Sequence, residues 1–390
     1  MIKREIGRYI LNLAKDYSVV TITGPRQSGK TTLVKELFPD KDYCNLEDLD
    51  IRLFAEQDPR GFLDQFKNGA ILDEIQRVPS LLNYIQTIVD NDKRKSLFIL
   101  TGSQQLELRQ GINQSLAGRV ALVTLLPLTI SEVTSFKKTP LTMDEQLFKG
   151  LYPRIYDENL DPYISYKNYI QTYIERDLRQ LISIRDLSNF QKFLKLCAGR
   201  IGCVLNKHSL SSEVGVSSTT IENWLSIMEA SNIIFRLQPY FENFGKRIIK
   251  SPKLYFVDTG LACHLLDIEN EKQVSRDPLR GNLIENLVFL ELVKYRYNMS
   301  LEHNLYYFRD HHQNEVDFIF KSGNKLTVIE VKSAKTVQPE YFKGLGFFNR
   351  LVPQQFKKGV LIYSGRNMIN FKGFSVLNYR ESRKVLDNAN

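Results

Sequence analysis

The sequence predicts an α/β fold that begins with a mostly parallel sheet covered by helices on both faces. Two observations support this. Short apolar strands alternate with helical stretches through the first third of the chain, and the first strand runs into a glycine-rich loop that opens a helix. Such alternation is typical of parallel sheets, because each crossover lays a helix on the sheet. The expected strands are 19–23, 43–46, 70–73, 97–101 and 120–125.

The loop after the first strand has the spacing G-x-x-x-x-G-K-[ST] of a phosphate-binding loop. Glycine lets the backbone wrap closely around a polyphosphate, and the following helix directs N–H groups toward it. Lys30 would place a cation on the β- and γ-phosphates, and the Thr31 hydroxyl would bind Mg²⁺. An ordinary glycine-rich turn is the alternative, but the strand and helix on either side favour a nucleotide site. The predicted nucleotide-binding residues are Gly24, Pro25, Arg26, Gln27, Ser28, Gly29, Lys30, Thr31 and Thr32.

Two adjacent carboxylates follow the third expected strand, in the stretch "GAILDEIQ". Asp73 would complete the Mg²⁺ shell, and Glu74 would act as general base for an attacking water. Solvated caps at a strand end are the alternative. After the next strand, Ser103 or Gln104 could contact the γ-phosphate or orient the water.

Arg119 lies in the stretch "SLAGRV", just before the last expected strand. An exposed arginine there could reach the nucleotide of a neighbouring subunit, which would make the protein a homo-oligomer. A surface arginine without a catalytic role is the alternative.

Taken together, "GPRQSGKTTL", "LDEIQ", "LTGSQQ", "SLAGRV", "YIQTYIERDLRQL" and "NEVDFI…IEVKS" resemble the AAA+-like P-loop ATPases of bacteria and archaea that carry an uncharacterised C-terminal domain. The resemblance implies ATP binding and hydrolysis with Mg²⁺. The chain departs from the family pattern at Leu151, where a second glycine is usual, and at Gln104, where a second serine is common.

The middle of the chain reads as helices. We divide the chain into an ATPase domain (1–135), a helical lid (136–198), a winged-helix-like module (199–255) and a nuclease-like C-terminal domain (256–390). In the lid, Arg176 could sense the phosphates or pair with a local carboxylate. The module is predicted from a helix at 209–214, a turn at Gly215 and a helix at 218–229. That second helix carries Glu222 and Glu229 and no Lys or Arg, so packing is favoured over DNA reading.

A hairpin around Gly323 and Asn324 defines the C-terminal site. With these two as turn residues, Asp317 lies opposite Glu330, and Glu315 opposite Lys332. Two facing carboxylates repel each other, which a divalent cation between them would offset. The second metal or nuclease-like site is therefore predicted from Glu285, Asp317, Glu330 and Lys332, an α/β restriction-endonuclease-like pattern. A structural hairpin with a Glu315–Lys332 surface ion pair is the alternative.

Charge and composition also indicate the kind of partner and the cellular compartment of the protein. Of the net charge of +9, residues 341–390 hold nine basic and two acidic side chains, a net of +7. This basic end predicts a nucleic-acid partner, with a solvated surface as the alternative. No apolar run is long enough to span a membrane, no signal-peptide core opens the chain, and the four scattered cysteines are predicted to be buried thiols of a cytoplasmic protein.

The sequence thus predicts Mg²⁺-dependent ATP hydrolysis coupled to conformational change on or near nucleic acid. The rival prediction is a nucleotide-driven protein-interaction switch with slow hydrolysis and a C-terminal domain that only binds.

Overall fold

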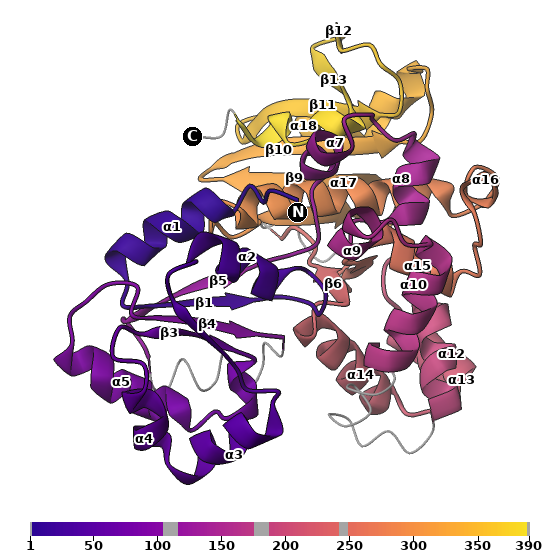
Figure 1. Ribbon diagram of the computed structural model, residues 1–390. Helices are drawn as coiled ribbons and strands as arrows, with labels where there is room; N and C mark the ends of the chain where they lie inside the picture. The colour runs from indigo at the N-terminus through magenta and orange to yellow at the C-terminus, as the bar shows by residue number, and fades with distance from the viewer. Residues whose placement is uncertain (1, 104–115, 175–186, 242–248, 388–390) are drawn as a thin grey trace.

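A computed structural model describes residues 2–103, 116–174, 187–241 and 249–387 (Figure 1). Within these ranges, five strands form a parallel sheet in the order β2-β3-β4-β1-β5. This confirms the predicted parallel sheet, and each predicted strand lies within one residue of an observed strand. The strands are β1 (Val19–Thr23), β2 (Asp42–Asn45), β3 (Ala70–Asp73), β4 (Phe98–Gly102) and β5 (Val120–Thr124).

Helices cover both faces of this sheet (Figure 1). One face packs against α1 (Gly7–Asp16) and α2 (Lys30–Leu37), and the other packs against α3 (Leu49–Gln57), α4 (Pro59–Asp64) and α5 (Leu81–Asn91). Side chains alternate along each strand, so both faces of a sheet covered in this way must be apolar. All five residues of β1 are β-branched and buried, as expected of a strand that is covered on both faces.

The middle of the chain, residues 130–274, is called the helical unit here. Its elements are α7 (Ile130–Lys137), α8 (Met143–Lys149), α9 (Pro153–Asp157), α10 (Pro162–Tyr169), a π-helical segment (Ile170–Ile174), α12 (Leu187–Ala198), α13 (Lys207–Val214), α14 (Ser218–Ala230), β6 (Ile234–Leu237), β7 (Lys253–Phe256), α15 (Thr259–Leu265) and α16 (Glu271–Val274).

The predicted helix–turn–helix in this unit is present. Gly215 ends α13 with φ +88°, a left-handed conformation that glycine adopts without steric cost. Antiparallel β6 and β7 follow α14. Arg236 on β6 forms ion pairs with Glu222 and Glu229 on α14 at 2.6 Å each. The acidic face of α14 is thus engaged within the unit, as expected of a helix that packs.

Residues 280–387, the C-terminal unit, contain a mixed sheet in the order β12-β13-β11-β10-β9-β8 over the part of the chain described. Helix α17 lies on one face and α18 on the other, with apolar residues of β9 and β10 alternating between them. The elements are α17 (Arg280–Tyr297), β8 (Leu305–Arg309), β9 (Glu315–Ser322), β10 (Lys325–Lys332), a 3₁₀ turn (Pro339–Phe342), α18 (Lys343–Leu351), β11 (Phe356–Tyr363), β12 (Ile369–Phe371), β13 (Phe374–Asn378), a 3₁₀ turn (Tyr379–Glu381) and α19 (Lys384–Asp387).

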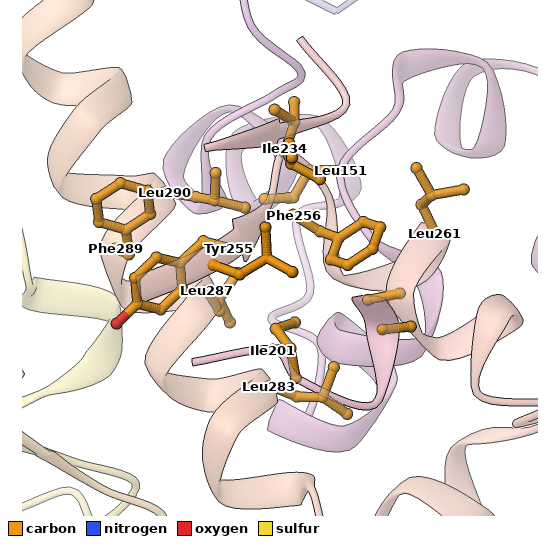
Figure 2. Packing of buried hydrophobic residues seen from close by; sticks show 14 of the residues in the cluster. Leu151, Ile201, Ile234, Tyr255, Phe256, Leu261, Leu283, Leu287, Phe289 and Leu290 are labelled. Carbon is orange, nitrogen blue, oxygen red and sulfur yellow. The ribbon is translucent and has the colours of Figure 1, made fainter. Parts of the chain in front are cut away.

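One hydrophobic core joins the helical and C-terminal units (Figure 2). Leu283, Leu287 and Leu290 of α17 point into it together with Tyr255 and Phe256 of β7. Helices α15 and α16 pack against α8, and α15 also contacts α10 and α12. The sequence-based division places these two helices in the C-terminal domain, whereas their packing joins them to the helical unit. In the described ranges, no helix is long and apolar enough to cross a membrane.

Candidate nucleotide site and a buried carboxylate cluster

The glycine-rich loop lies between β1 and α2, at the carboxyl edge of the parallel sheet. Gly24 has φ +147°, and a Cβ there would lie 2.1 Å from the backbone oxygen of Leu125. Gly29, with φ +91°, immediately precedes α2. Both glycines are therefore required by backbone geometry, and the loop turns tightly enough to present its N–H groups.

Lys30 is buried and has no carboxylate within ion-pair distance in the described structure. Its Nζ donates to the backbone oxygens of Gly24 and Pro25, both at 3.0 Å. Burial lowers the pKa of Lys30 to about 8, although Glu74 and Asp73 act in the opposite direction. The hydroxyl of Ser28 in the same loop is buried without a hydrogen-bond partner. The loop thus holds polar groups that a polyphosphate would satisfy.

Asp73 ends β3 and is buried between hydroxyl groups. Its Oδ2 accepts hydrogen bonds from Thr31 Oγ1 and from the Tyr43 hydroxyl, each at 2.8 Å, and its Oδ1 accepts one from Thr101. A hydroxyl and a carboxylate in direct contact match the oxygen ligands that Mg²⁺ prefers beside a nucleotide. Thr31 and Asp73, the predicted metal ligands, are brought together.

Glu74 has φ +57°, a left-handed conformation that is uncommon for a residue with a side chain. Its carboxylate accepts hydrogen bonds from Ser103 Oγ at 3.1 Å and from the side chain of Gln76. Ser103 therefore orients Glu74, which is a role that the sequence analysis did not assign to it. A held carboxylate at the edge of the loop is placed as a general base must be.

A cavity of about 550 Å³ lies over the loop. Glu74 lines it, and so do five of the predicted nucleotide-binding residues besides Lys30: Arg26, Gln27, Gly29, Thr31 and Thr32. The opposite wall comes from the helical unit, through Pro153, Arg154, Thr172 and Tyr173. A ligand in this cavity would therefore contact two units at once, as expected of a nucleotide beneath a lid.

Arg4, which the sequence analysis missed, connects this loop to the rest of the molecule. Its buried guanidinium donates to the backbone oxygens of Ser28 at 2.8 Å and Leu126 at 2.6 Å, and to Glu132 at 3.2 Å. Glu132 caps α7, and the backbone N–H of Ile130 in the same helix donates to Glu291 of α17. No motif marks Arg4, because it precedes a helix in a generally basic stretch.

Arg119 lies at the amino-terminal ends of the strands, whereas the loop lies at their carboxyl ends. Val120 pairs with Val19 at the start of both strands, whereas the loop follows Thr23, roughly 15 Å away at about 3.3 Å per residue. The guanidinium forms a two-point ion pair with Asp90, one contact being 3.1 Å. A role in its own subunit's site is excluded by this position, and a role in a neighbour's site stays a prediction. Gln104 and Arg176 lie outside the described residues.

The predicted hairpin register in the C-terminal unit is confirmed from Lys325↔Ser322 to Ile329↔Phe318. Beyond it, Asp317 accepts a hydrogen bond from the backbone N–H of Val331 at 2.8 Å. Glu330 pairs with Lys332 at 2.5 Å. The alternative expectation of a Glu315–Lys332 pair is wrong, because Glu315 instead contacts the buried Lys253 of β7.

Lys253 changes the interpretation of this cluster. Its Nζ lies 3.0 Å from Glu285, 2.6 Å from Glu315 and 3.8 Å from Asp317. The predicted repulsion is between Asp317 and Glu330, and Asp317 adds to the raised pKa of Glu330. Lys253 lies near Asp317 and Lys332 pairs with Glu330, so protein ammonium groups offset part of this repulsion and a second divalent cation is not supported. Among the described residues, no group of three or more His, Cys, Asp or Glu side chains is arranged to hold a metal ion.

The pKa values follow from burial and charge. Burial raises the pKa of Glu330 to about 8, with Asp317 adding to the effect. Burial also raises the pKa of Glu285 to about 7, although Lys253 opposes it. Burial alone would lower the pKa of Lys253, but Glu285, Asp317 and Glu315 together raise it. A charged residue opening the apolar strand "KLYF" was the sequence signal that could have pointed to this lysine.

Comparison with known families supports the interpretation of the loop. Residues 16–134 match the family described as "AAA domain". This N-terminal domain belongs to the AAA+-like P-loop ATPases. Residues 141–272 and 280–381 match two families described as domains of unknown function, DUF8612 and DUF4143. The gap between these two matches runs from the end of α16 to the start of α17.

The chain also resembles uncharacterised proteins along most of its length. One from Mycobacterium tuberculosis is 29% identical, covering 90% of this chain and 77% of the relative. One from Methanocaldococcus jannaschii is 24% identical, covering 77% of this chain and 74% of the relative.

Two solved structures were also found to be similar. A Walker-type ATPase of Pyrococcus abyssi has a TM-score of 0.44 and 15% identity, covering 68% of this chain and 96% of that one. The AMPPCP-bound DnaA of Aquifex aeolicus has a TM-score of 0.31 and 13% identity, covering 57% and 85%. Neither TM-score reaches 0.5, so the assignment depends on the family match and on the geometry of the loop.

Proposed function

We propose that the protein hydrolyses ATP with Mg²⁺ and uses the cycle to change how its helical and C-terminal units are held. The observation that carries this proposal is the cavity over the loop. It is lined by the buried ammonium of Lys30, which forms no ion pair in the described structure, and by the oriented carboxylate of Glu74. Lys30 would bind the β- and γ-phosphates, and the N–H groups of the loop would surround them. Thr31 and Asp73 would hold Mg²⁺, which supplies positive charge against the phosphate oxygens.

Hydrolysis needs a proton acceptor for the attacking water, and Glu74 is the residue placed for it. Ser103 and Gln76 fix its carboxylate, and its backbone N–H donates to Thr101 Oγ1 at 3.3 Å. Because Thr101 also donates to Asp73, the two carboxylates are oriented from one strand. The proton would pass from water to Glu74 as the water oxygen bonds to the γ-phosphorus and the bond from that phosphorus to the bridging oxygen breaks, which releases ADP and phosphate.

Coupling would run through Arg4. The segment before α1 contacts the loop through Arg4, and Glu5 of the same segment pairs with Arg383 near the end of the C-terminal unit at 2.9 Å. A nucleotide that moves the Ser28 carbonyl would thereby act on α7 and, through it, on α17. This chain of buried contacts runs without a break from the phosphate-binding loop to α17.

We further propose that the ATPase acts on nucleic acid, because net positive charge gathers in residues 341–390. The rival function is a nucleotide-driven interaction switch with a C-terminal unit that does not cut. Lys253 favours the non-catalytic part of that rival, since its ammonium offsets charge on Glu285, Glu315 and Asp317 and no metal-holding group is found among the described residues. ATP turnover raised several-fold by DNA or RNA would separate the first function from the second.

The test compares ATP binding and turnover in three variants. Lys30→Ala should lose nucleotide binding, because it removes ground-state charge. Glu74→Gln should retain binding but lose turnover by about 10²- to 10⁴-fold, because it removes only the base. Glu56→Gln, on an exposed site of α3, is the matched control and should resemble the wild type. Wild-type turnover in Glu74→Gln would remove Glu74 from the mechanism.

A further inference from the structure

A second large cavity lies between the helical and C-terminal units, away from the nucleotide loop. Its volume is about 1070 Å³. One wall comes from the start of α8 and from α16, and the other from the loops that follow β10, β11 and β13. We call it the interunit groove. The nucleotide mechanism does not use it.

The groove lies at the carboxyl edge of parallel strands. Strand β11 pairs in parallel with both β10 and β13, so all three strands end at the same edge of the sheet. Each is followed within three residues by a cation: Lys335 after β10, Arg366 after β11 and Arg380 after β13. Ligands of open α/β sheets commonly bind at this edge, because the loops there converge.

The loops are fixed rather than loosely apposed. Ser364 Oγ lies 2.8 Å from the backbone oxygens of both Ser333 and Ala334, and Asn378 donates to the Gly365 oxygen at 2.6 Å. A Cβ on Gly365 would lie 2.4 Å from the backbone oxygen of Lys335. The backbones at Lys335 and at Gly365, next to Arg366, therefore approach closely, and both cations line the groove.

The groove is lined by more cations than carboxylates: Lys272, Arg280, Lys335, Arg366 and Arg380 against Asp144, Glu271 and Glu381. Lys272 of α16, Lys335 and Arg366 are exposed, and no acidic side chain in the described ranges forms an ion pair with any of them. The guanidinium of Arg380 donates to the backbone oxygen of Leu141. This oxygen carries no formal charge, so the hydrogen bond does not neutralise Arg380. By contrast, Asp144 in the groove is already paired with Arg280 at 2.7 Å.

We propose that the interunit groove binds the phosphate backbone of a nucleic-acid strand. Four cations from four segments suit a chain of phosphates better than a single small anion. Met368 lines the groove beside Arg366 with 55% of its surface exposed, which offers an apolar contact for a base. The inference depends on the proposed action on nucleic acid and assigns it a site.

The experiment measures binding of a fluorescent DNA strand of about 20 nucleotides to the full chain over about 50 to 200 mM salt. The groove variant carries Lys272→Ala, Lys335→Ala and Arg366→Ala. The control variant carries Lys15→Ala, Arg60→Ala and Lys93→Ala, the same loss of charge from exposed residues that lie outside both the groove and residues 341–390. ATP binding and thermal unfolding should match the wild type in both.

We expect the groove variant to lose at least about tenfold in affinity at 0.1 M salt and its salt slope to fall by about two to three, while the control changes little. Equal losses in both variants would overturn the groove while leaving nucleic-acid action intact. No binding of DNA or RNA by the wild type would overturn both proposals. Polyglutamate competing as well as nucleic acid of equal charge would replace the occupant with an acidic protein segment.

Discussion

Two buried lysines of this protein have opposite electrostatic surroundings. Among the described residues, the Lys30 ammonium donates hydrogen bonds to backbone oxygens alone, and burial lowers its pKa to about 8. Lys253 lies among three carboxylates, which raise its pKa despite burial. Burying a charge is costly unless a partner compensates it. The Lys30 site is therefore incomplete until an anion arrives, whereas the Lys253 site is complete as it is.

This contrast separates a binding site from a structural one better than sequence motifs do. Both regions match short functional patterns, a phosphate-binding loop and a nuclease-like carboxylate set. In the first, the polar groups are left for a ligand, and in the second, protein ammonium groups already pair with the carboxylates.

The largest expected difference concerns stability. Lys253→Met would leave Glu285, Glu315 and Asp317 without their shared cation, which should lower the free energy of unfolding by about 3–5 kcal/mol. Lys30→Met should leave it unchanged or slightly raised, because burial already disfavours that charge. Urea unfolding without nucleotide measures both. A loss below about 1 kcal/mol for Lys253→Met, the size expected of an exposed pair, would contradict the comparison.

The next expected effect is on the pH dependence of ATP affinity. Only the protonated form of Lys30 attracts phosphate, and its pKa without ligand is about 8. Affinity should therefore be flat below pH 8 and should fall by up to about tenfold per pH unit above it. Titration with a fluorescent ATP analogue between about pH 6 and 10 measures this. Lys30→Arg, which stays charged, is the control, and a wild type as flat as this control would remove Lys30 as the titrating group.

Substitution of Arg119 should have the smallest effect on stability, and it also tests whether subunits assemble. It is a partly exposed arginine paired with Asp90, so Arg119→Ala should cost at most about 1 kcal/mol. If it completes a neighbour's site, mixing Arg119→Ala with Lys30→Ala protein should restore some ATP turnover. Absence of rescue in assemblies shown to mix would assign Arg119 to the Asp90 ion pair alone.

Local chemistry explains which parts of the molecule could be predicted. The loop, Thr31, Asp73 and Glu74 follow from spacing on one sheet edge, and the hairpin register follows from its two-residue turn. Lys253 and Arg4 could not be found in this way, because each acts on residues far away in the sequence. Lys253 contacts Glu315, 62 positions later, and Arg4 contacts Glu132, 128 positions later. Such pairings depend on how whole units pack, which no local pattern records.

The shared core of Figure 2 has a consequence for heat denaturation and for modularity. The parallel sheet has hydrophobic clusters of its own on both faces, so it can melt separately. The helical and C-terminal units share Leu283, Leu287 and Tyr255 in one cluster, so they should absorb heat in a single transition. Although two family matches divide them, neither unit is a self-sufficient module, because separation would expose the apolar side of α17 to water.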